Sequence, residues 1–309
     1  MNEKIGKVVL DYRCYSGKDL YSDGDIEDKL LELVKHYKKS EFNQVISRTQ
    51  DWTVMYHLSH IRSNILGSVQ INKTDDVLEI GSGCGAITGA LAKKANKVTC
   101  IELSKKRSLI NAFQNQDYDN IQIKVGNFQD IESYLKEKFD VITLIGVFEY
   151  AQLYIQSQYP FVDFLKKILE HLKPDGRIIL AIENKFGMKY WAGCQEDHIG
   201  GYFSGLEGYR DKEKKVMTFS KKELEKIFRD VGFEKYDFYY PYPDYKFPMA
   251  IYSDDFLPRE GELNRNLQNF DRQRMVLFNE TNVYDEILKD GMFPFFSNSF
   301  LVVLYKGRE

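Results

Sequence analysis

Hydrophobic runs and amphipathic segments alternate through the centre of the chain. Continuous apolar runs of the kind that forms buried strands occupy residues 75–80, 97–103, 139–148 and 177–184, and residues 120–128 alternate between apolar and polar side chains. Between these runs lie segments with helical spacing of apolar residues, such as FVDFLKKILEHL. This alternation, with short connections, predicts an α/β fold in which helices cover both faces of a parallel sheet.

The N-terminal part and a central loop depart from this rhythm. Residues 25–37 and 52–66 have helical periodicity, so residues 1–65 are expected to form a helical cap in front of a Rossmann-like domain at 66–240. Residues 184–217, rich in Gly, Tyr and Trp, form an expected insertion in that domain. Long loops in compact domains are usually functional.

The C-terminal part is expected to close the sheet after a second insertion. Ser220 and Gly232 bound a predicted helix at 220–233, which a strand follows. Residues 241–295 are expected to form an insertion on the substrate side, irregular over 241–258 and helical over 262–290. Residues 296–309 are expected to hold the final strand.

Charge and cysteine content narrow the function classes. The net charge of −3 gives the chain no overall attraction to nucleic acid or to an anionic membrane. The four cysteines have no metal-binding spacing and are too few for a disulfide framework, so no metal site is expected. The sequence shows neither a membrane-spanning run nor a secretory signal. These features predict a cytoplasmic globular protein.

The sharpest chemical signal is VLEIGSGCG at residues 77–85, where a buried strand runs into Gly81, Gly83 and Gly85 and then a helix. Glycines at such a turn let the backbone bend tightly and touch a ligand. Glu102 ends the next strand, where a carboxylate accepts both hydroxyls of an adenosine ribose. The pattern therefore predicts a site for an adenosine-containing cofactor.

Two cofactors fit this pattern. With Ala86, the loop also matches the dinucleotide fingerprint GxGxxG/A, so NAD is one candidate. Glu79 at the strand tip would be repelled by the pyrophosphate of NAD but attracted by the ammonium and sulfonium groups of S-adenosylmethionine. The charge of Glu79 therefore favours S-adenosylmethionine, with NAD as the alternative.

Further segments make the sequence similar to a known family. VLEIGSGCGAITGALA resembles the first motif of class I S-adenosylmethionine-dependent methyltransferases, KVTCIEL the second, GNFQDI the third and FDVITLIGVFEY the fourth; LKPDGRIILAIEN looks like the segment ending in their fifth strand. The resemblance covers residues 70–184 and resumes at 220–240. It implies a Rossmann-like, doubly wound, mostly parallel seven-stranded sheet with an antiparallel last strand. It also implies S-adenosyl-L-methionine as cofactor and S-adenosyl-L-homocysteine as product.

The resemblance implies roles for individual residues by their place in each motif. The three glycines cradle the methionine part of the donor, Glu79 lies near its ammonium group, and Glu102 holds the ribose. Asn127 and Phe128 flank the adenine, although many family members have Asp in place of Asn127. Ile145 and Gly146 lie under the methyl-transfer centre.

The acceptor class follows from a missing motif and a second resemblance. Nucleic-acid N-methyltransferases of this class carry an Asn/Asp-Pro-Pro-Tyr type of tetrad after the fourth strand, whereas this chain reads IGVFEY. An exocyclic base amine is therefore not expected, although the first motif resembles that of rRNA adenine dimethylases. ENKFGMKYWAGCQEDHIGGYFSGLEGY at 183–209 looks like a segment of bacterial methyltransferases of cell-surface polysaccharide assembly, which are often linked to glycosyltransferases.

The second resemblance implies methylation of a hydroxyl of a glycan or glycan precursor, with a glycosyltransferase as partner and no nucleic acid. The alternatives are a small-molecule or RNA methyltransferase, and a non-catalytic module that binds the donor or its product.

An alcohol that attacks the sulfonium methyl must lose its proton, so we expect a side-chain base. His198 is the first candidate, because it lies in the long loop after the fifth strand and ligands bind at the carboxyl ends of such strands. A packing role for His198 is the alternative, and Glu149 and Asp197 are weaker candidates. Residues that could touch a sugar ring or a phosphate are Tyr190, Trp191, Tyr202, Tyr209 and Lys105 to Arg107.

Overall fold

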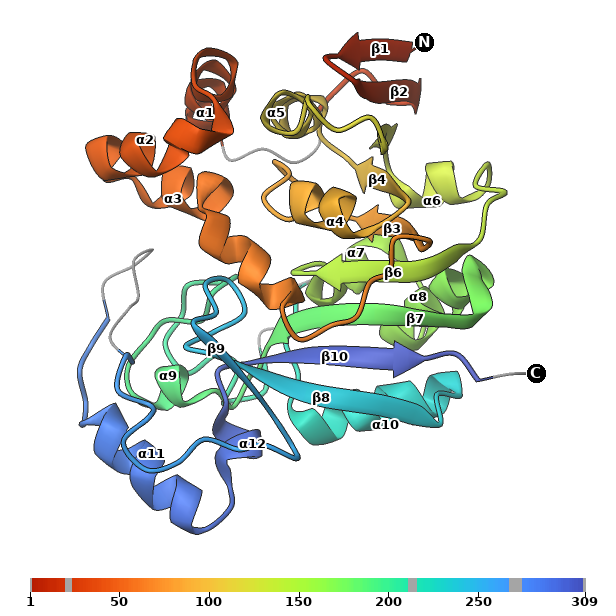
Figure 1. The fold of residues 1–309 in the computed structure, drawn as a ribbon. Helices are drawn as coiled ribbons and strands as arrows, with labels where there is room; N and C mark the ends of the chain where they lie inside the picture. Colours follow the sequence, from red (N-terminus) through yellow and green to blue (C-terminus); the bar gives the residue numbers. More distant parts are fainter. Residues whose placement is uncertain (1, 20–23, 211–215, 267–273, 308–309) are drawn as a thin grey trace. The chain divides into compact units, whose positions relative to one another are not determined.

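The computed structural model describes residues 2–19, 24–210, 216–266 and 274–307. The chain divides into two compact units (Figure 1). The first unit comprises residues 1–144 and 170–177, and the second unit comprises residues 145–169 and 178–309. The fold is mixed α/β as expected, but the sheet has ten strands instead of seven.

The strands of the first unit follow the order β1-β2-β5-β4-β3-β6. All neighbours from β2 to β6 are parallel, and only β1 turns back antiparallel on β2. The central strands β3 and β4 are buried on both faces, because every residue after the first one in each strand is buried, as is typical of parallel sheets covered by helices. The elements of this sheet and its covering helices are β1 (Asn2–Ile5), β2 (Val8–Cys14), β3 (Asp76–Ile80), α4 (Thr88–Lys94), β4 (Lys97–Glu102), α5 (Lys105–Gln114), β5 (Ile121–Gly126), α6 (Phe128–Glu132) and β6 (Phe139–Ile145).

The expected helical cap at residues 1–65 is only partly helical. Residues 2–14 form the hairpin β1–β2, and β2 extends the sheet because its buried Val8 and Leu10 fall on alternate positions next to β5. The expected helix at 25–37 is confirmed. The expected helix at 52–66 is interrupted at Ser59, whose extended backbone ends the α-helix and whose hydroxyl caps a following 3₁₀ helix.

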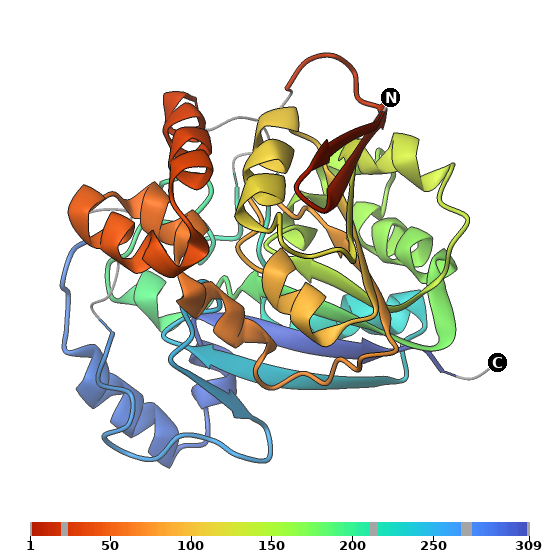
Figure 2. The same cartoon turned by 45° about the horizontal axis from the view of Figure 1, so that its top comes forward.

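The N-terminal helices share a core with α5 and the glycine loop (Figures 1 and 2). They are α1 (Asp25–His36), η1 (Lys39–Glu41), α2 (Phe42–Thr49), α3 (Trp52–Leu58) and η2 (His60–Leu66). Leu30 of α1, Val54 of α3 and Ile110 of α5 belong to this buried cluster, together with Cys84 of the loop. Acidic residues of α1 also form ion pairs with basic residues of α5: Arg107 pairs with the buried Glu27 at 2.7 Å, and Lys106 pairs with Asp28. Two of the three basic residues at 105–107, Lys106 and Arg107, are therefore already paired with acidic residues of α1.

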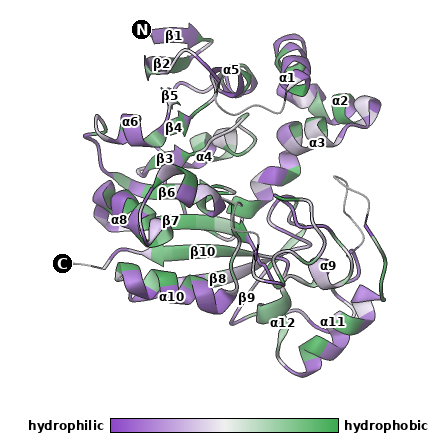
Figure 3. Cartoon of the chain, turned by 180° about the vertical axis from the view of Figure 1, so that it is seen from behind, coloured by the Kyte–Doolittle hydropathy of each residue, from purple (hydrophilic) through white to green (hydrophobic). Residues whose placement is uncertain are grey.

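The strands of the second unit follow the order β7-β10-β8-β9, and β8 is antiparallel to both β10 and β9. The expected antiparallel last strand is confirmed. Strands β7 and β10 carry mostly hydrophobic side chains, whereas α8 and α10 show both polar and apolar residues (Figure 3). The elements are η3 (Phe148–Tyr150), α7 (Ala151–Tyr154), α8 (Pro160–Glu170), β7 (Leu172–Glu183), α9 (Met188–Trp191), α10 (Lys221–Val231), β8 (Lys235–Tyr242), β9 (Ala250–Ser253), α11 (Glu280–Lys289), α12 (Phe293–Phe296) and β10 (Ser299–Tyr305).

The C-terminal insertion has more strand structure over residues 241–258 than its sequence indicates. Its described residues over 262–290 contain less helix than expected. Residues 241–258 contain the end of β8 and all of β9, because β8 pairs with β9 in register despite the neighbouring prolines. Of the expected helix at 262–290, the structure shows α11 over Glu280–Lys289. Residues 211–215 and 267–273 of the two expected insertions lie outside the described residues. In the described part of the chain, no helix combines the length and apolarity that crossing a bilayer requires.

Candidate functional site

The glycine loop follows β3 directly and is held by backbone and amide contacts. Gly81, Gly83 and Gly85 all have positive φ, a conformation that favours glycine. The backbone N–H of Gly81 donates to the Ile101 carbonyl at 2.9 Å. The side-chain amide of Gln114 donates to the Cys84 carbonyl at 2.7 Å. The loop is therefore held in place by contacts with α5 and β4.

The side facing away from α5 is open at Gly83. A Cβ added to Gly83 would meet no atom of the described residues within 4 Å, whereas a Cβ on Gly85 would lie 2.3 Å from the Asn111 side chain. The Glu102 carboxylate accepts a hydrogen bond from the Gly83 N–H at 2.8 Å and one from Ser104 N–H at 2.9 Å. The structure thus brings together the three glycines and Glu102, which the sequence analysis expects to bind the same cofactor.

Glu79 lies beneath this loop and is only 6% exposed. Its Oε2 accepts hydrogen bonds from Thr88 Oγ1 at 2.6 Å and from Cys100 Sγ at 3.4 Å, and its Oε1 accepts none from the described residues. Burial raises the pKa of Glu79 to about 7, although both hydrogen bonds favour the ionised form. A nearby cation would shift this balance toward the carboxylate.

The remaining expected cofactor residues are spread over the ends of β5 and β6. Asn127 follows β5 and caps α6, because its side chain accepts the Gln129 N–H at 3.3 Å. Phe128 is 4% exposed and belongs to the core. Ile145 ends β6, and Gly146 follows with positive φ and donates its N–H to the Ala181 carbonyl at 3.0 Å.

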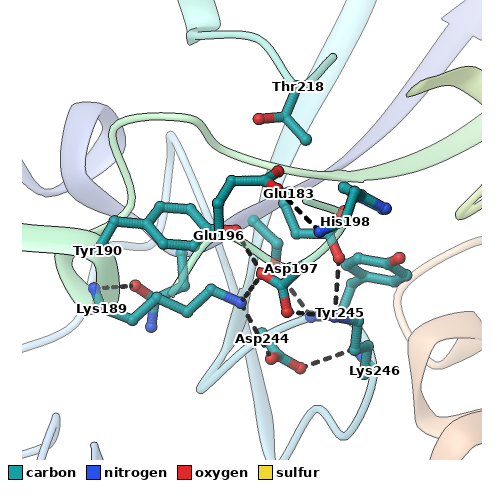
Figure 4. A network of polar contacts seen from close by, with 12 residues as sticks. Glu183, Lys189, Tyr190, Glu196, Asp197, His198, Thr218, Asp244, Tyr245 and Lys246 are labelled. Atoms are coloured by element: carbon teal, nitrogen blue, oxygen red, sulfur yellow. Dashed lines mark hydrogen bonds and ion pairs between the residues drawn. The ribbon is translucent and has the colours of Figure 1, made fainter. Parts of the chain in front are cut away.

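The second unit holds a cluster of mostly buried charged side chains around His198, which we call the acidic cluster. Figure 4 shows six of its members: Glu183, Lys189, Glu196, Asp197, His198 and Lys246. The buried Glu149 is the seventh. His198 Nε2 lies 3.4 Å from Glu183 Oε2 and 4.0 Å from Glu149 Oε1. Lys246 Nζ bridges Glu183 Oε1 at 2.9 Å and Asp197 Oδ1 at 2.7 Å. All three expected catalytic residues therefore belong to one cluster.

Asp197 is the most completely paired member of the cluster. Lys189 Nζ lies 2.7 Å from its Oδ2, and the Tyr190 hydroxyl donates to the same oxygen. Burial alone would raise the pKa of Asp197, but Lys189 and Lys246 hold it well below its usual range. A carboxylate so engaged is suited to positioning its neighbours.

Glu149 is the least paired member. Its side chain is 1% exposed, and neither carboxylate oxygen accepts a hydrogen bond from the described residues. A Cβ built on Gly146 would lie 3.7 Å from Glu149 Oε1 and 2.8 Å from the Tyr245 hydroxyl. Glu149 and Tyr245 therefore flank Gly146, the residue that the fourth motif places at the methyl-transfer centre.

The buried charges shift one another's pKa values. Burial would lower the pKa of His198, but Glu183 and Glu149 outweigh it and raise that pKa to about 9. Burial, helped by Glu183, raises the pKa of Glu149 to about 8. Burial would also raise the pKa of Glu183, but Lys246 and His198 hold it well below its usual range. In the ligand-free protein at neutral pH, His198 and Glu149 therefore both hold protons.

Several members of the cluster are absent from the sequence-based candidates. Glu183 has a visible signal, since it is a charged residue at the end of the apolar run RIILAIE. Lys189, Lys246 and Tyr245 have none, because they lie in segments without periodicity. Tyr190 is 3% exposed and bonded to Asp197, so stacking on a ligand is excluded for it, whereas Trp191 and Tyr202 are exposed.

The sheet order, the glycine loop and the carboxylate at the end of β4 define an α/β domain of the Rossmann-like nucleotide-binding class. A family model described as a methyltransferase domain matches residues 50–237. The chain belongs to this family. Its cofactor is S-adenosyl-L-methionine, and the open Gly83, the three left-handed glycines and the adjacent Glu102 fit that group.

Curated relatives match over a short stretch. Ribosomal RNA small subunit methyltransferase A of Ligilactobacillus salivarius is 31% identical over 83 residues, which is 26% of this chain and 28% of that protein. An rRNA adenine N-6-methyltransferase of Limosilactobacillus reuteri is 39% identical over 64 residues, covering 21% of this chain and 26% of that protein. The matches thus span little more than a quarter of the length of these relatives.

Solved structures match over more of the chain at lower identity. The complex of the Haloferax volcanii Trm112 methyltransferase activator with a methyltransferase gives 18% identity, 88% coverage of this chain, 99% coverage of that chain and a TM-score of 0.47. The N-methyltransferase NodS of Bradyrhizobium japonicum, in complex with S-adenosyl-L-homocysteine, gives 21% identity, coverages of 42% and 61%, and a TM-score of 0.32.

Proposed function

We propose that the protein transfers a methyl group from S-adenosyl-L-methionine to a hydroxyl of a glycan or glycan precursor. One observation supports the hydroxyl acceptor above the others: a buried carboxylate, Glu149, lies without a hydrogen-bond partner among the described residues beside Gly146. A weakly acidic alcohol needs help to lose its proton, and such a group at the end of β6 is suited to that task.

For the donor, we propose the roles that the motifs imply. Gly81, Gly83 and Gly85 form the cradle for the methionine part, and Glu102 exchanges its bond to Gly83 N–H for the ribose hydroxyls. The donor supplies an electrophilic methyl carbon on a sulfonium. The ionised form of Glu79 compensates the donor ammonium. Asn127, Phe128, Ile145 and Gly146 complete the proposed set.

For the acceptor, we propose that the hydroxyl is activated next to Glu149 and His198. Asp197 is proposed as a positioning residue, since two lysines and a tyrosine occupy its oxygens. In the reaction, the hydroxyl passes its proton to the deprotonated form of His198 or Glu149, its oxygen attacks the methyl carbon, and the carbon–sulfur bond breaks with its electron pair staying on sulfur. Trp191 and Tyr202 are the exposed aromatic residues proposed to contact a sugar ring.

An RNA acceptor is the second candidate, because curated relatives that match this chain include rRNA methyltransferases. That similarity is confined to about a quarter of the chain. The net charge of −3 and the absence of proline from IGVFEY count against an RNA base amine. A glycosyltransferase partner remains part of the proposal for a glycan acceptor.

The test combines donor binding with methyl transfer. We expect calorimetry to show binding of S-adenosyl-L-methionine and not of NAD, and radiolabelled methyl groups to enter a glycan panel rather than rRNA. His198→Ala should lower turnover by about 100-fold or more without changing donor affinity. His60→Ala, an exposed histidine of η2, is the matched control. Transfer to rRNA alone would overturn the glycan proposal, and donor binding without transfer to any acceptor would favour the non-catalytic module.

A further inference from the structure

Three potential metal ligands converge in the acidic cluster. Nε2 of His198 and one carboxylate oxygen each of Glu149 and Glu183 all lie within 4.8 Å of one another. Ligand atoms about 2.1 Å from a common ion are separated by roughly 3.0–3.4 Å in octahedral or tetrahedral geometry. The 3.4 Å between His198 and Glu183 already matches that spacing, and a small side-chain rotation would bring Glu149 from 4.0 Å into it.

Each of these groups has an atom free to face an ion. Glu149 is buried, and its oxygens accept no hydrogen bond from the described residues. Glu183 binds Lys246 through Oε1, which leaves Oε2 on the side of His198. His198 Nδ1 lies 3.1 Å from the Tyr150 hydroxyl, so with the proton on Nδ1 donated to Tyr150, Nε2 presents its lone pair to the carboxylates. Such a partner on the second nitrogen is what metal-binding histidines usually have.

The charge of the cluster also fits a divalent cation once His198 and Glu149 have released the protons that they hold at neutral pH, as metal binding requires. Its buried carboxylates are Glu149, Glu183, Glu196 and Asp197, and its buried ammonium groups are Lys189 and Lys246. With a neutral imidazole, the buried carboxylates exceed the buried ammonium groups by two negative charges. A divalent cation would compensate both, and uncompensated buried charge is costly.

We propose that Glu149, Glu183 and His198 form a binding site for a divalent metal ion. Two carboxylates and one imidazole suit borderline-hard ions such as Mn²⁺. The sequence gives no hint of this site, because its ligands come from η3, the end of β7 and the loop after α9, without local spacing.

For its role, this inference rests on the proposed function. A divalent ion lowers the pKa of an oxygen ligand. An acceptor hydroxyl held at this site would therefore release its proton to solvent water more readily. Its oxygen would keep the electron pair that forms the new bond to the methyl carbon. The ion would thus activate the acceptor in place of a free side-chain base.

The test measures metal binding directly, without methyl transfer. Full-length protein treated with EDTA and dialysed is titrated with Mn²⁺, and free Mn²⁺ is followed by electron paramagnetic resonance. We expect one Mn²⁺ per chain. Loss of an outer partner of a metal ligand alone costs about 10- to 100-fold in affinity, so Glu149→Gln, Glu183→Gln and His198→Gln should each weaken binding at least tenfold.

His171→Gln is the matched control, since His171 lies 3.5 Å from Glu132 in another buried pair. Circular dichroism establishes that each variant is folded. Absence of Mn²⁺ binding by the wild type, or unchanged binding by all three ligand variants, would overturn the site.

A separate measurement keeps the two proposals apart. Methyl transfer that continues in EDTA, with no Mn²⁺ bound, would overturn the role of the ion in the reaction and leave the proposed function intact. Failure to bind S-adenosyl-L-methionine would remove the proposed function whatever the outcome with Mn²⁺.

Discussion

The glycine loop takes its main parts from one stretch, residues 77–102, whereas the acidic cluster joins η3, the end of β7, the loop after α9 and the segment before β9. The loop is held by its own backbone N–H groups, which donate to Ile101, Ser82 and Glu102, and its three glycines have left-handed backbone conformations. The cluster presents buried charges that hold one another in place. Substitutions in the loop region should therefore act mainly on the donor, and substitutions in the cluster on stability and turnover.

The largest effect expected from this comparison is at Asp197. Asp197→Asn leaves the buried ammonium groups of Lys189 and Lys246 without their shared carboxylate. Breaking a buried ion pair from one side costs roughly 3–5 kcal/mol, so the free energy of unfolding should fall by that order. Urea denaturation of the wild type and the variant measures this difference.

Asp254→Asn is the control for this experiment. Asp254 pairs with Lys221 but is 52% exposed, so its loss should cost less than about 1 kcal/mol. If the two variants prove equally stable, the acidic cluster does not hold its segments together, and the contrast with the loop disappears.

The next largest effect concerns the donor. Glu102→Ala should weaken binding of S-adenosyl-L-methionine at least tenfold, about 1.4 kcal/mol, because the two charge-assisted hydrogen bonds that we propose to the ribose would be lost. Calorimetry gives the affinities, with Asp28→Ala, an exposed acid of α1, as the control. Equal affinities for the Glu102 and Asp28 variants would show that another residue holds the ribose.

The contrast between the glycine loop and the acidic cluster also explains which features the sequence alone could predict. The run from Val77 to Glu102 predicts strand, turn, helix and ribose carboxylate together, because those features depend on neighbours in sequence. The pairing of Lys246 with Glu183 and Asp197 depends on how β7 and the segment before β9 come together, which no local pattern encodes.

The hairpin at residues 2–14 and the short helix α11 show the same limit in the fold. Val8 and Leu10 alternate as a strand should, but their pairing with β5 joins segments more than a hundred residues apart. The polar segment 262–290 is expected to be helical, whereas among its described residues the structure shows α11 over Glu280–Lys289, where the Asn279 side chain caps it. Strand pairing determines the hairpin, and side-chain capping determines where α11 begins. Local propensity alone predicts such elements only weakly.

The smallest effect expected is a pH dependence of donor binding at Glu79. Burial sets the pKa of its carboxyl near 7 in the free protein, and the donor ammonium favours the carboxylate. Protons and donor therefore compete, and the affinity should rise with pH. The ionised fraction grows from about 9% at pH 6 to about 91% at pH 8, so the rise is at most about tenfold.

Glu79→Gln removes this titration, while the donor's own groups titrate equally with both proteins. The ratio of wild-type to variant affinity, measured by calorimetry from pH 6 to 8, therefore reports on Glu79 alone. An affinity ratio that grows with pH supports the presence of the donor's cationic group next to the Glu79 carboxylate. A ratio that stays constant would mean that Glu79 only anchors Thr88 and Cys100 beneath the loop, and that the backbone of the glycines binds the methionine part without its help.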